Sequence, residues 1–365
     1  MNYLKKYYAG KTVLVTGHTG FKGSWLSMWL TLLGAKVIGV SNEVPTQPSN
    51  FEVSEVASGL EDHRIDVTDA DAVKKIILDS KVDYVFHLAA QALVRPSYES
   101  PLQTLQTNTM GTANILDALR FVDHPVVAVM ITSDKAYDNV EWTWVYREND
   151  RLGGKDPYSA SKGMAELVIR SYVQSFFQNN SHVKVGVTRA GNVIGGGDWA
   201  VDRIIPDCVR AWAGSQSVDI RSPHATRPWQ HVLEPLSGYL LLGATLFDSK
   251  TLNGEAYNFG PAASQNVPVS ELINEMEKSW NSVRWSDVSV DSHVHEAGLL
   301  KLNCDKALSD LGWLPTLKFE ETVAMTANWY KAYYDDEKSS MPGVTIKQIQ
   351  NYVLLAKKRG LQWAK

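Results

Sequence analysis

A tyrosine and a lysine four residues apart could perform acid–base chemistry in this chain. Tyr158 and Lys162 occur in the segment YSASK, and a helix over about 157–177 would place both side chains on one face. A free tyrosine has a pKa of about 10 and is a poor base at neutral pH, but a nearby cation stabilises the phenolate and lowers that pKa. The pair could therefore remove a proton from a substrate hydroxyl. The spacing alone is a weak signal, because any exposed helix can carry it.

Three glycines form a second motif. Gly17, Gly20 and Gly23 have the spacing GxxGxxG between a predicted strand over 11–16 and a predicted helix over 24–33. Glycine is needed in such a turn, because a side chain would block the approach of the backbone to a pyrophosphate and the packing of helix on strand. The N-terminus of the helix then offers unpaired N–H groups to the anion. This context predicts a dinucleotide site, and an incidental glycine-rich turn is the alternative.

The adenosine half of that dinucleotide lacks one expected partner. The second predicted strand, over 36–40, should end in an acid that binds the ribose hydroxyls, but Ser41, Asn42 and Glu43 follow it instead. Glu43 could replace the acid from the loop, or Ser41 and Asn42 could hold the ribose. No arginine stands there to bind a 2′-phosphate, so NAD is favoured over NADP. Asp66, at the end of a third predicted strand over 64–67, is expected at the adenine edge, with an ordinary turn acid as the alternative.

The elements that must position these residues alternate along the chain. Apolar, β-branched runs predict further strands, and helical periodicity predicts helices between them, which together give an α/β fold with a doubly wound (Rossmann-type) parallel sheet. We expect an NAD-binding domain of residues 1–190 plus about 231–261, and a smaller α+β substrate-binding domain of about 191–230 plus 262–365. Residues 191–230 show little periodicity, 337–343 read as a linker, and a final helix over 346–358 has no assigned role. The predicted strands lie at 83–88, 126–132, 184–188 and 255–259, and the predicted helices at 70–79, 103–120, 232–246, 269–280 and 319–334.

Composition excludes several classes of protein. The 365 residues are 44% hydrophobic and 21% charged, which is ordinary for a globular chain and argues against a disordered or coiled-coil one. A net charge of −4 gives no reason to bind nucleic acid, and no run approaches the roughly 18 apolar residues that would cross a membrane. Cys208 and Cys304 lack metal-ligand spacing, which fits a soluble protein of the reducing cytoplasm. The motif of His293, His295 and Glu296 superficially suggests a metal site but has no third ligand at meaningful spacing, so no metal is predicted.

These motifs resemble a known family. The segments TGHTGFKG at 16–23 and HLAAQ at 87–91, together with Tyr158 and Lys162, are similar to the extended short-chain dehydrogenase/reductase family. The segments TSDK at 132–135, GDWA at 197–200, TRPWQHVLEPL at 226–236 and LGWLP at 311–315 resemble its branch of nucleotide-sugar dehydratases that act on CDP-glucose.

The resemblance implies a lyase that converts CDP-D-glucose to CDP-4-dehydro-6-deoxy-D-glucose and water by internal hydride transfer through NAD, within deoxysugar and O-antigen biosynthesis. The alternatives are a nucleotide-sugar 4-epimerase and a dehydratase of a different NDP-hexose. An epimerase shares Tyr158 and Lys162 but needs neither Asp134 nor Lys135. A non-catalytic dinucleotide sensor is disfavoured, since it has no need of the Tyr158/Lys162 pair.

The resemblance also implies roles for particular residues. Ser133 would orient the sugar 4-OH, Asp134 would protonate the leaving 6-OH and Lys135 would accept the C5 proton, so Asp134 must carry a proton and Lys135 must be at least transiently neutral. A polar cap at a strand end is the alternative for this trio. The residues expected to hold NAD are Gly17, Thr19, Gly20, Phe21, Lys22, Gly23, Asp66, Val67, Leu88, Ala89, Ala90, Thr132, Tyr158 and Lys162.

The substrate side is expected to use a second group of residues. Asn192 and Arg227 would hold the diphosphate, since a guanidinium matches paired phosphate oxygens. The residues expected to approach the rest of the nucleotide sugar are Gln91, Trp199, Arg203 and His231. A surface ion pair, a core aromatic and a structural histidine are the respective alternatives for Arg203, Trp199 and His231. The family pattern further implies a homodimer through the helices at 103–120 and 157–177, with a dimer of dimers left open.

Overall fold

A seven-stranded parallel sheet organises the chain. The computed structural model describes residues 2–178, 182–249, 251–262, 265–280, 283–289, 300–335 and 340–365. The strands follow the order β11-β6-β5-β4-β1-β2-β3, and every neighbouring pair is parallel. This is the strand order of a doubly wound dinucleotide-binding sheet, so the predicted fold class is confirmed. The strands are β1 (Thr12–Thr16), β2 (Lys36–Ser41), β3 (Glu61–Arg64), β4 (Tyr84–His87), β5 (Val126–Ile131), β6 (Val183–Ala190) and β11 (Ala256–Phe259).

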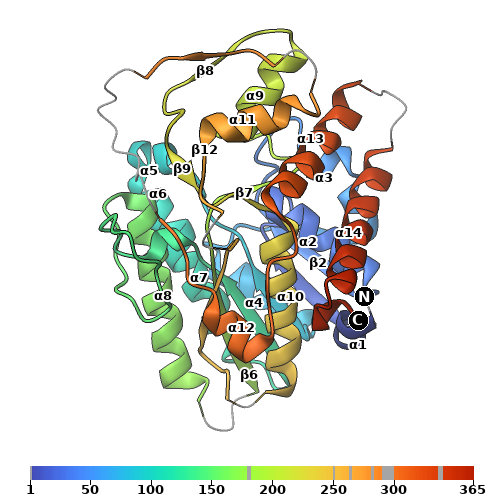
Figure 1. The fold of residues 1–365 in the computed structure, drawn as a ribbon. Coiled ribbons are helices and arrows are strands. Elements are labelled where there is room, and N and C mark those ends of the chain that lie inside the picture. The colour runs from blue at the N-terminus through green and yellow to red at the C-terminus, as the bar shows by residue number, and fades with distance from the viewer. Residues whose placement is uncertain are drawn as a thin grey trace.

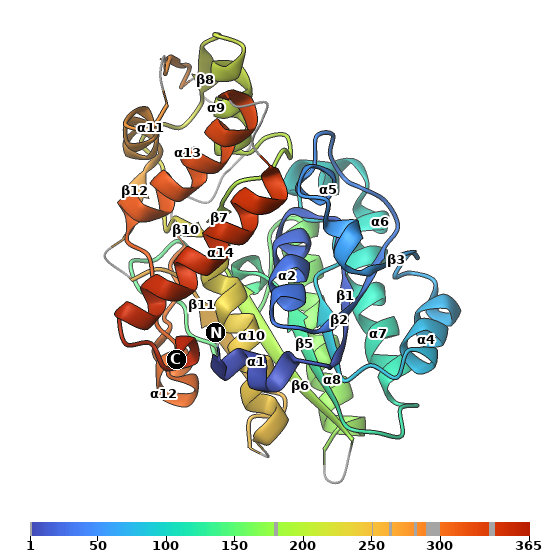
Figure 2. The same ribbon diagram turned by 90° about the vertical axis from the view of Figure 1, so that its right-hand side faces the viewer.

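Helices cover both faces of the sheet and produce two apolar cores. Alternate residues of a strand point to opposite faces, so Val13 and Val15 of β1 join one core and Leu14 joins the other. The first core includes α1 (Asn2–Tyr8), α2 (Phe21–Leu32) and α10 (Leu233–Asp248). The second includes α4 (Ala70–Asp79), α7 (Gly111–Leu119) and α8 (Pro157–Phe176). Figure 2 shows these two helix layers on either side of the strands.

Three predicted elements differ from the structure in ways that matter for the site. The predicted helix over 103–120 consists of α6 (Pro101–Leu105), a π-helical turn (Gln106–Met110) and α7. The predicted strand over 64–67 is β3, which ends at Arg64, so Asp66 lies beyond the strand. The helix predicted from residue 24 begins at Phe21, which places the last glycine of the motif inside its first turn.

The segment 191–230 is more regular than we expected. It contains α9 (Ile204–Ala213), whose buried residues Ile205, Cys208, Val209 and Trp212 have helical spacing, so the expectation of little periodicity was wrong there. It also contains the short strands β7 (Val193–Ile194), β8 (Val218–Ile220), β9 (Thr226–Arg227) and β10 (Gln230–His231). These pair with one another or with β12 (Val267–Pro268) and β13 (Trp285–Asp287).

The last third of the chain packs above and beside the sheet (Figure 1). Its helices are α11 (Val269–Glu277), α12 (Asp305–Leu311), α13 (Phe319–Asp335) and α14 (Met341–Lys358). The linker prediction was wrong for residues 341–343, which form the first turn of α14, while 337–339 lie outside the described residues. Tyr352 of α14 meets Trp29 of α2 edge to face, with ring centroids 5.8 Å apart, so this helix covers the dinucleotide-binding half.

Two kinds of feature are absent from the described residues. No helix in the described ranges is long and apolar enough to cross a membrane. Within those same ranges, no group of three or more His, Cys, Asp or Glu residues is arranged to hold a metal ion. The motif containing His293, His295 and Glu296 lies outside the described residues.

Candidate active site

A large cleft lies at the carboxyl ends of the strands. Its volume is about 1700 Å³, and its walls come from the turns after β1, β2, β4, β5 and β6 and from the segment 191–230. Ligands of open α/β sheets bind at this edge. All but one of the residues predicted to bind cofactor or substrate line this cleft, and the exception is His231.

The glycine turn fits an anionic dinucleotide. Gly17 has φ +72°, and a Cβ on it would lie 2.8 Å from the backbone nitrogen of Ala89, so a side chain would collide with the turn after β4. A Cβ on Gly23 would overlap the carbonyl oxygen of Gly17. Gly20 caps α2 without any side-chain hydrogen bond, so the first N–H groups of the helix face the cleft without a side-chain acceptor. Such a helix end binds a diphosphate.

The residues expected at the adenosine end reach the same cleft. The Thr19 hydroxyl donates a 2.6 Å hydrogen bond to the carbonyl oxygen of Glu43 and lies 3.0 Å from the Ser41 hydroxyl, which holds the loop after β2 against the glycine turn. Asp66 accepts hydrogen bonds from both the backbone N–H and the hydroxyl of Thr68, each 2.8 Å long. Asp66 is therefore a turn acid that also lines the cleft.

The trio after β5 forms a tight turn facing the cleft. The Ser133 hydroxyl accepts from the backbone N–H of Lys135 (3.2 Å) and donates to the Asp134 carboxylate (3.0 Å), capping a 3₁₀ turn over Asp134–Ala136. Ser133 and Asp134 are buried, whereas Lys135 is half-buried. The trio thus has the geometry of a strand-end cap, and its three side chains also line the space where a substrate would bind.

Tyr158 and Lys162 project from the first turns of α8. Asp156 caps this helix by accepting a 2.9 Å hydrogen bond from the backbone N–H of Ser159. Burial raises the pKa of Tyr158 to about 12, although a hydrogen bond with Ser133 and the charge of Arg203 act in the opposite direction. The groups that act to lower this pKa are Ser133 and Arg203, whereas the sequence led us to expect Lys162 together with an oxidised nicotinamide. Burial also lowers the pKa of Lys162 to about 8, against the opposing charge of Glu166.

Lys22 adds a further ammonium to the cleft. It follows Phe21 in the first turn of α2, and burial together with the charges of Arg203 and Lys162 lowers its pKa to about 8, whereas Asp134 acts to raise it. Lys22 therefore lies within electrostatic reach of the proposed acid. From the sequence, we expect Lys22 only among the residues that hold NAD.

Several of the residues expected to contact substrate already form hydrogen bonds or ion pairs within the protein. Arg203 forms a 2.6 Å ion pair with Asp198, and Arg227 donates to the carbonyl oxygen of Thr226 at 2.9 Å. Trp199 is buried, donates its indole N–H to Tyr334 (3.1 Å) and packs edge to face on Tyr333. Arg203 and Trp199 therefore have the structural roles weighed above while also lining the cleft.

Of the three remaining residues expected to contact substrate, two line the cleft and one does not. His231 is fully buried away from the cleft, packs against Trp25 and accepts a 3.3 Å hydrogen bond from the backbone N–H of Leu233. Burial lowers its pKa to about 3, which fits a neutral structural histidine. Gln91 lines the cleft but uses its side-chain amide on Leu93 and Thr104. Asn192 lines the cleft.

Three residues near the reacting groups were missed by sequence reasoning. Asn108, in the π-helical turn, accepts from the backbone N–H of Gln91 (2.8 Å) and donates to Ser161 (2.8 Å) within YSASK. Glu166 and Arg189 form a buried ion pair beneath the cleft. Only Glu166 carried a local signal, because it lies four residues after Lys162 and therefore on the same helix face.

The chain matches known proteins along most of its length. A family model for GDP-mannose 4,6 dehydratase matches residues 14–326. The CDP-glucose 4,6-dehydratase of Salmonella typhimurium is 46% identical over 337 residues, which cover 91% of this chain and 94% of that protein. The dTDP-glucose 4,6-dehydratase of Streptomyces antibioticus is 30% identical over 87% of this chain and 92% of that protein.

Solved structures share the fold. The UDP-glucose 4-epimerase of Thermotoga maritima, solved with UDP-glucose, has a TM-score of 0.77 at 22% identity and covers 88% of this chain and 99% of its own. An epimerase of Methanothermobacter thermautotrophicus has a TM-score of 0.78 at 24% identity, covering 92% of this chain and 96% of its own. Because the family model spans most of the chain and the relatives match it nearly end to end, the chain belongs to the family of GDP-mannose 4,6 dehydratases within the extended short-chain dehydrogenases/reductases.

Proposed function

We propose that this chain is an NAD-dependent lyase that converts CDP-D-glucose to CDP-4-dehydro-6-deoxy-D-glucose and water. One observation carries the proposal: Ser133, Asp134 and Lys135 line the same cleft as Tyr158 and Lys162. The Ser133–Asp134–Lys135 turn supplies the acid and the base that an elimination needs. Tyr158 and Lys162 supply the base and the nearby cation that the oxidation of an alcohol needs. The 46% identity to a CDP-glucose 4,6-dehydratase over 91% of the chain supports the same reaction.

The glycine turn and the loops after β2 and β4 hold NAD in this proposal. Bound NAD supplies a hydride acceptor for C4 of the sugar and then a hydride donor for C6, so no external reductant is consumed. The open N-terminus of α2 faces the diphosphate, and Glu43 and Asp66 lie toward the adenosine end. Thr132, Leu88, Ala89 and Ala90 line the cleft between that turn and the reacting groups.

The first half of the reaction makes a ketone at C4. Tyr158 accepts the proton of the 4-OH as the C4–H bond breaks, so the alcohol is oxidised. Ser133, which is hydrogen-bonded to Tyr158, orients the hydroxyl. Lys162, charged below a pH of about 8, favours the phenolate electrostatically.

The second half expels water across C5 and C6. The C4 ketone acidifies the C5 hydrogen, and Lys135 accepts that proton. Asp134 protonates the 6-OH as the C6–O bond breaks, which leaves a C5–C6 double bond and one water. Return of the hydride to C6 and of a proton to C5 completes the 6-deoxy-4-keto sugar. Lys135 gives its proton back to C5, so the cycle ends with Tyr158 protonated and Asp134 ionised. Transfer of the Tyr158 proton through the Ser133 hydroxyl, which donates to the Asp134 carboxylate, resets both groups.

The diphosphate and nucleoside of the substrate lie toward the segment 191–230. Arg227 and Asn192 hold the diphosphate, whereas Arg203 and Trp199 border the nucleoside. In this assignment, residues 191–230 and those from 262 onward bind the nucleotide sugar, and the sheet with residues 1–190 and about 231–261 binds NAD.

The competing function is 4-epimerisation, which the fold similarity to epimerases favours. The test is a comparison of CDP-, dTDP-, UDP- and GDP-glucose with the NAD-loaded enzyme, followed by alkaline absorbance of the 4-keto product. We expect the keto sugar to form fastest from CDP-glucose. Recovery of CDP-galactose without any keto product would assign the chain to the epimerases, and preference for another nucleotide would reassign the substrate.

The enzyme acts as a homodimer in this proposal. An apolar patch on α6, the π-helical turn and α8 consists of Leu102, Met110, Met164 and Leu167, whose side chains are exposed, Leu102 by 80%. Figure 1 shows α6 and α8 beside each other on one side of the molecule. Pairing of two such patches would bury these side chains in a four-helix interface. Sedimentation should show a dimer that Leu167→Glu converts to a monomer, and a wild-type monomer would refute it.

A further inference from the structure

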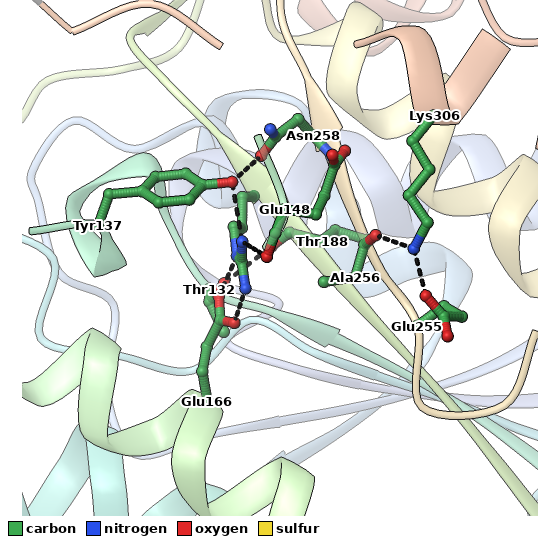
Figure 3. A network of polar contacts seen from close by, with 10 residues as sticks. Thr132, Tyr137, Glu148, Glu166, Thr188, Glu255, Ala256, Asn258 and Lys306 are labelled. Carbon is green, nitrogen blue, oxygen red and sulfur yellow. Dashed lines mark hydrogen bonds and ion pairs between the residues drawn. The ribbon is translucent and has the colours of Figure 1, made fainter. Parts of the chain in front are cut away.

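A buried ion pair lies directly beneath the reacting groups. Arg189 of β6 donates from Nε to Glu166 of α8 at 2.6 Å, and its Nη2 forms a second, shorter contact with the other carboxylate oxygen. The two side chains are 2% and 4% exposed. Figure 3 shows the partners of this ion pair, with Glu166 on α8, Thr132 and Tyr137 on either side of the turn after β5, and Asn258 on β11.

This pair contacts the polypeptide on both sides of the catalytic turn. Thr132, immediately before Ser133, donates its hydroxyl to Glu166 at 2.6 Å. Tyr137, immediately after the turn over Asp134–Ala136, accepts at its hydroxyl from Nη1 of Arg189 at 2.8 Å. The same tyrosine donates to Asn258 of β11 at 2.8 Å. The turn that carries the acid and the base is therefore fixed at both ends to one ion pair.

The pair is also attached to the oxidising residues. Tyr158, Lys162 and Glu166 are spaced by four, so they follow one another along a single face of α8. The negative charge of Glu166 acts on Lys162 and favours its charged form. One carboxylate thus joins the helix of Tyr158 and Lys162 to the strand end that leads into Ser133.

We propose that Glu166 and Arg189 are positioning residues that hold the Ser133–Asp134–Lys135 turn in register with Tyr158 and Lys162, so that oxidation and elimination act on one bound sugar. The inference rests on the proposed function and assigns the pair no contact with substrate. A buried ion pair is a weak source of stability, because desolvation offsets much of its attraction. Because the pair contacts both the catalytic turn and α8, we assign it the role of positioning these two elements relative to each other.

Thr132→Val tests the link without disturbing the ion pair. The substitution keeps the shape and removes the hydroxyl, which donates to Glu166 and lies 3.1 Å from the carbonyl oxygen of Thr188. In single turnovers with the NAD-loaded enzyme and CDP-glucose, we expect elimination to slow at least about tenfold more than C4 oxidation does, whatever Thr132→Val does to NAD binding. The reduced nicotinamide should therefore accumulate. Thr132→Ser, which keeps the hydroxyl, should restore elimination to within about threefold.

A matched control separates this effect from the loss of any buried hydroxyl. Thr326 of α13 is fully buried, donates to the carbonyl oxygen of Thr322 and does not line the cleft. Thr326→Val should leave both steps at the wild-type rate. Unchanged elimination in Thr132→Val, or equal slowing of elimination in Thr326→Val, would overturn the inference.

Two further measurements keep the test independent of fold and of substrate. The double variant Glu166→Gln with Arg189→Met removes both charges of the pair together, and it should show the same accumulation of reduced nicotinamide as Thr132→Val. Elimination at the wild-type rate in that variant would show that the pair does not position the catalytic turn, and the inference would be wrong. Amide hydrogen exchange over Ser133–Tyr137 should quicken in Thr132→Val even without substrate, and unchanged exchange counts against the inference. Failure of the proposed function would show in the wild-type enzyme, which would make no keto product.

Discussion

The pH dependence of C4 oxidation should break near the pKa of Lys162. Burial lowers that pKa from 10.5 to about 8, a difference that disfavours the charged form by about 3 kcal/mol. About nine tenths of the molecules therefore carry the charge at pH 7 and about one tenth at pH 9. The pKa of Tyr158 lies higher, at about 12, so its phenolate increases about tenfold with each pH unit across this range.

The two ionisations together set the shape of the profile. Below about pH 8, Lys162 is charged and the rate should rise about tenfold per unit with the phenolate. Above that pH each unit gains phenolate but loses the ammonium, so the profile should become flat. Lys162→Arg keeps its charge to much higher pH, and its profile should continue to rise above pH 8.

The assay is the single-turnover formation of reduced nicotinamide at saturating CDP-glucose from pH 6 to about 10. We compare the shapes of the two pH profiles and not their absolute rates, because arginine will also change the absolute rate. Circular dichroism at each pH shows whether the proteins stay folded. A break near pH 8 that persists in Lys162→Arg would show that another group titrates, and the assignment of Lys162 would then be wrong.

Other perturbations address the remaining parts of the site and the fold. Asp134→Asn combined with Lys135→Met should leave C4 oxidation intact and slow elimination by about 10²- to 10⁴-fold, whereas equal loss of both steps would contradict the division of labour. Gly17→Ala should weaken NAD binding at least about tenfold in a titration, because its Cβ meets the backbone at Ala89; Gly360→Ala, with φ +78° and open space around it, is the matched control. Burial raises the pKa of Glu234 from 4.5 to about 7, so the stability that its neutral form contributes is complete below pH 4.5 and is lost as pH rises through about 7. Denaturant unfolding should show the stability of wild type relative to Glu234→Gln falling by roughly 3 kcal/mol from pH 5 to pH 9, and a constant difference would refute it.

The sheet and the cofactor turn could be predicted because their signals are local. Strands such as Val126–Ile131 are continuous apolar runs, and the glycine spacing reports a steric need within one turn. The positions of Ser133 and Tyr158 followed once each was placed at the end of a strand or the start of a helix, and both line the cleft.

What could not be predicted depends on contacts between distant residues. Arg189 reads as one more residue of a strand until the fold brings Glu166 and Tyr137 to it. The raised pKa of Tyr158 is a consequence of burial, which no spacing of tyrosine and lysine reports. His231 was assigned to substrate on resemblance, but the packing of Trp25 keeps it inside the core.

The number of residues in the π-helical turn sets the positions of side chains near the reacting groups. Each residue of a regular α-helix advances the winding by about 100°, and the wide turn over Gln106–Met110 absorbs one residue beyond that regular pitch. Deleting that residue would give a smoother helix but would swing Asn108 away from Ser161 and Gln91, or else rotate Leu102 out of its patch. A change in chain length here would therefore reach both the reaction and the assembly of the protein, although no group that touches substrate had been altered.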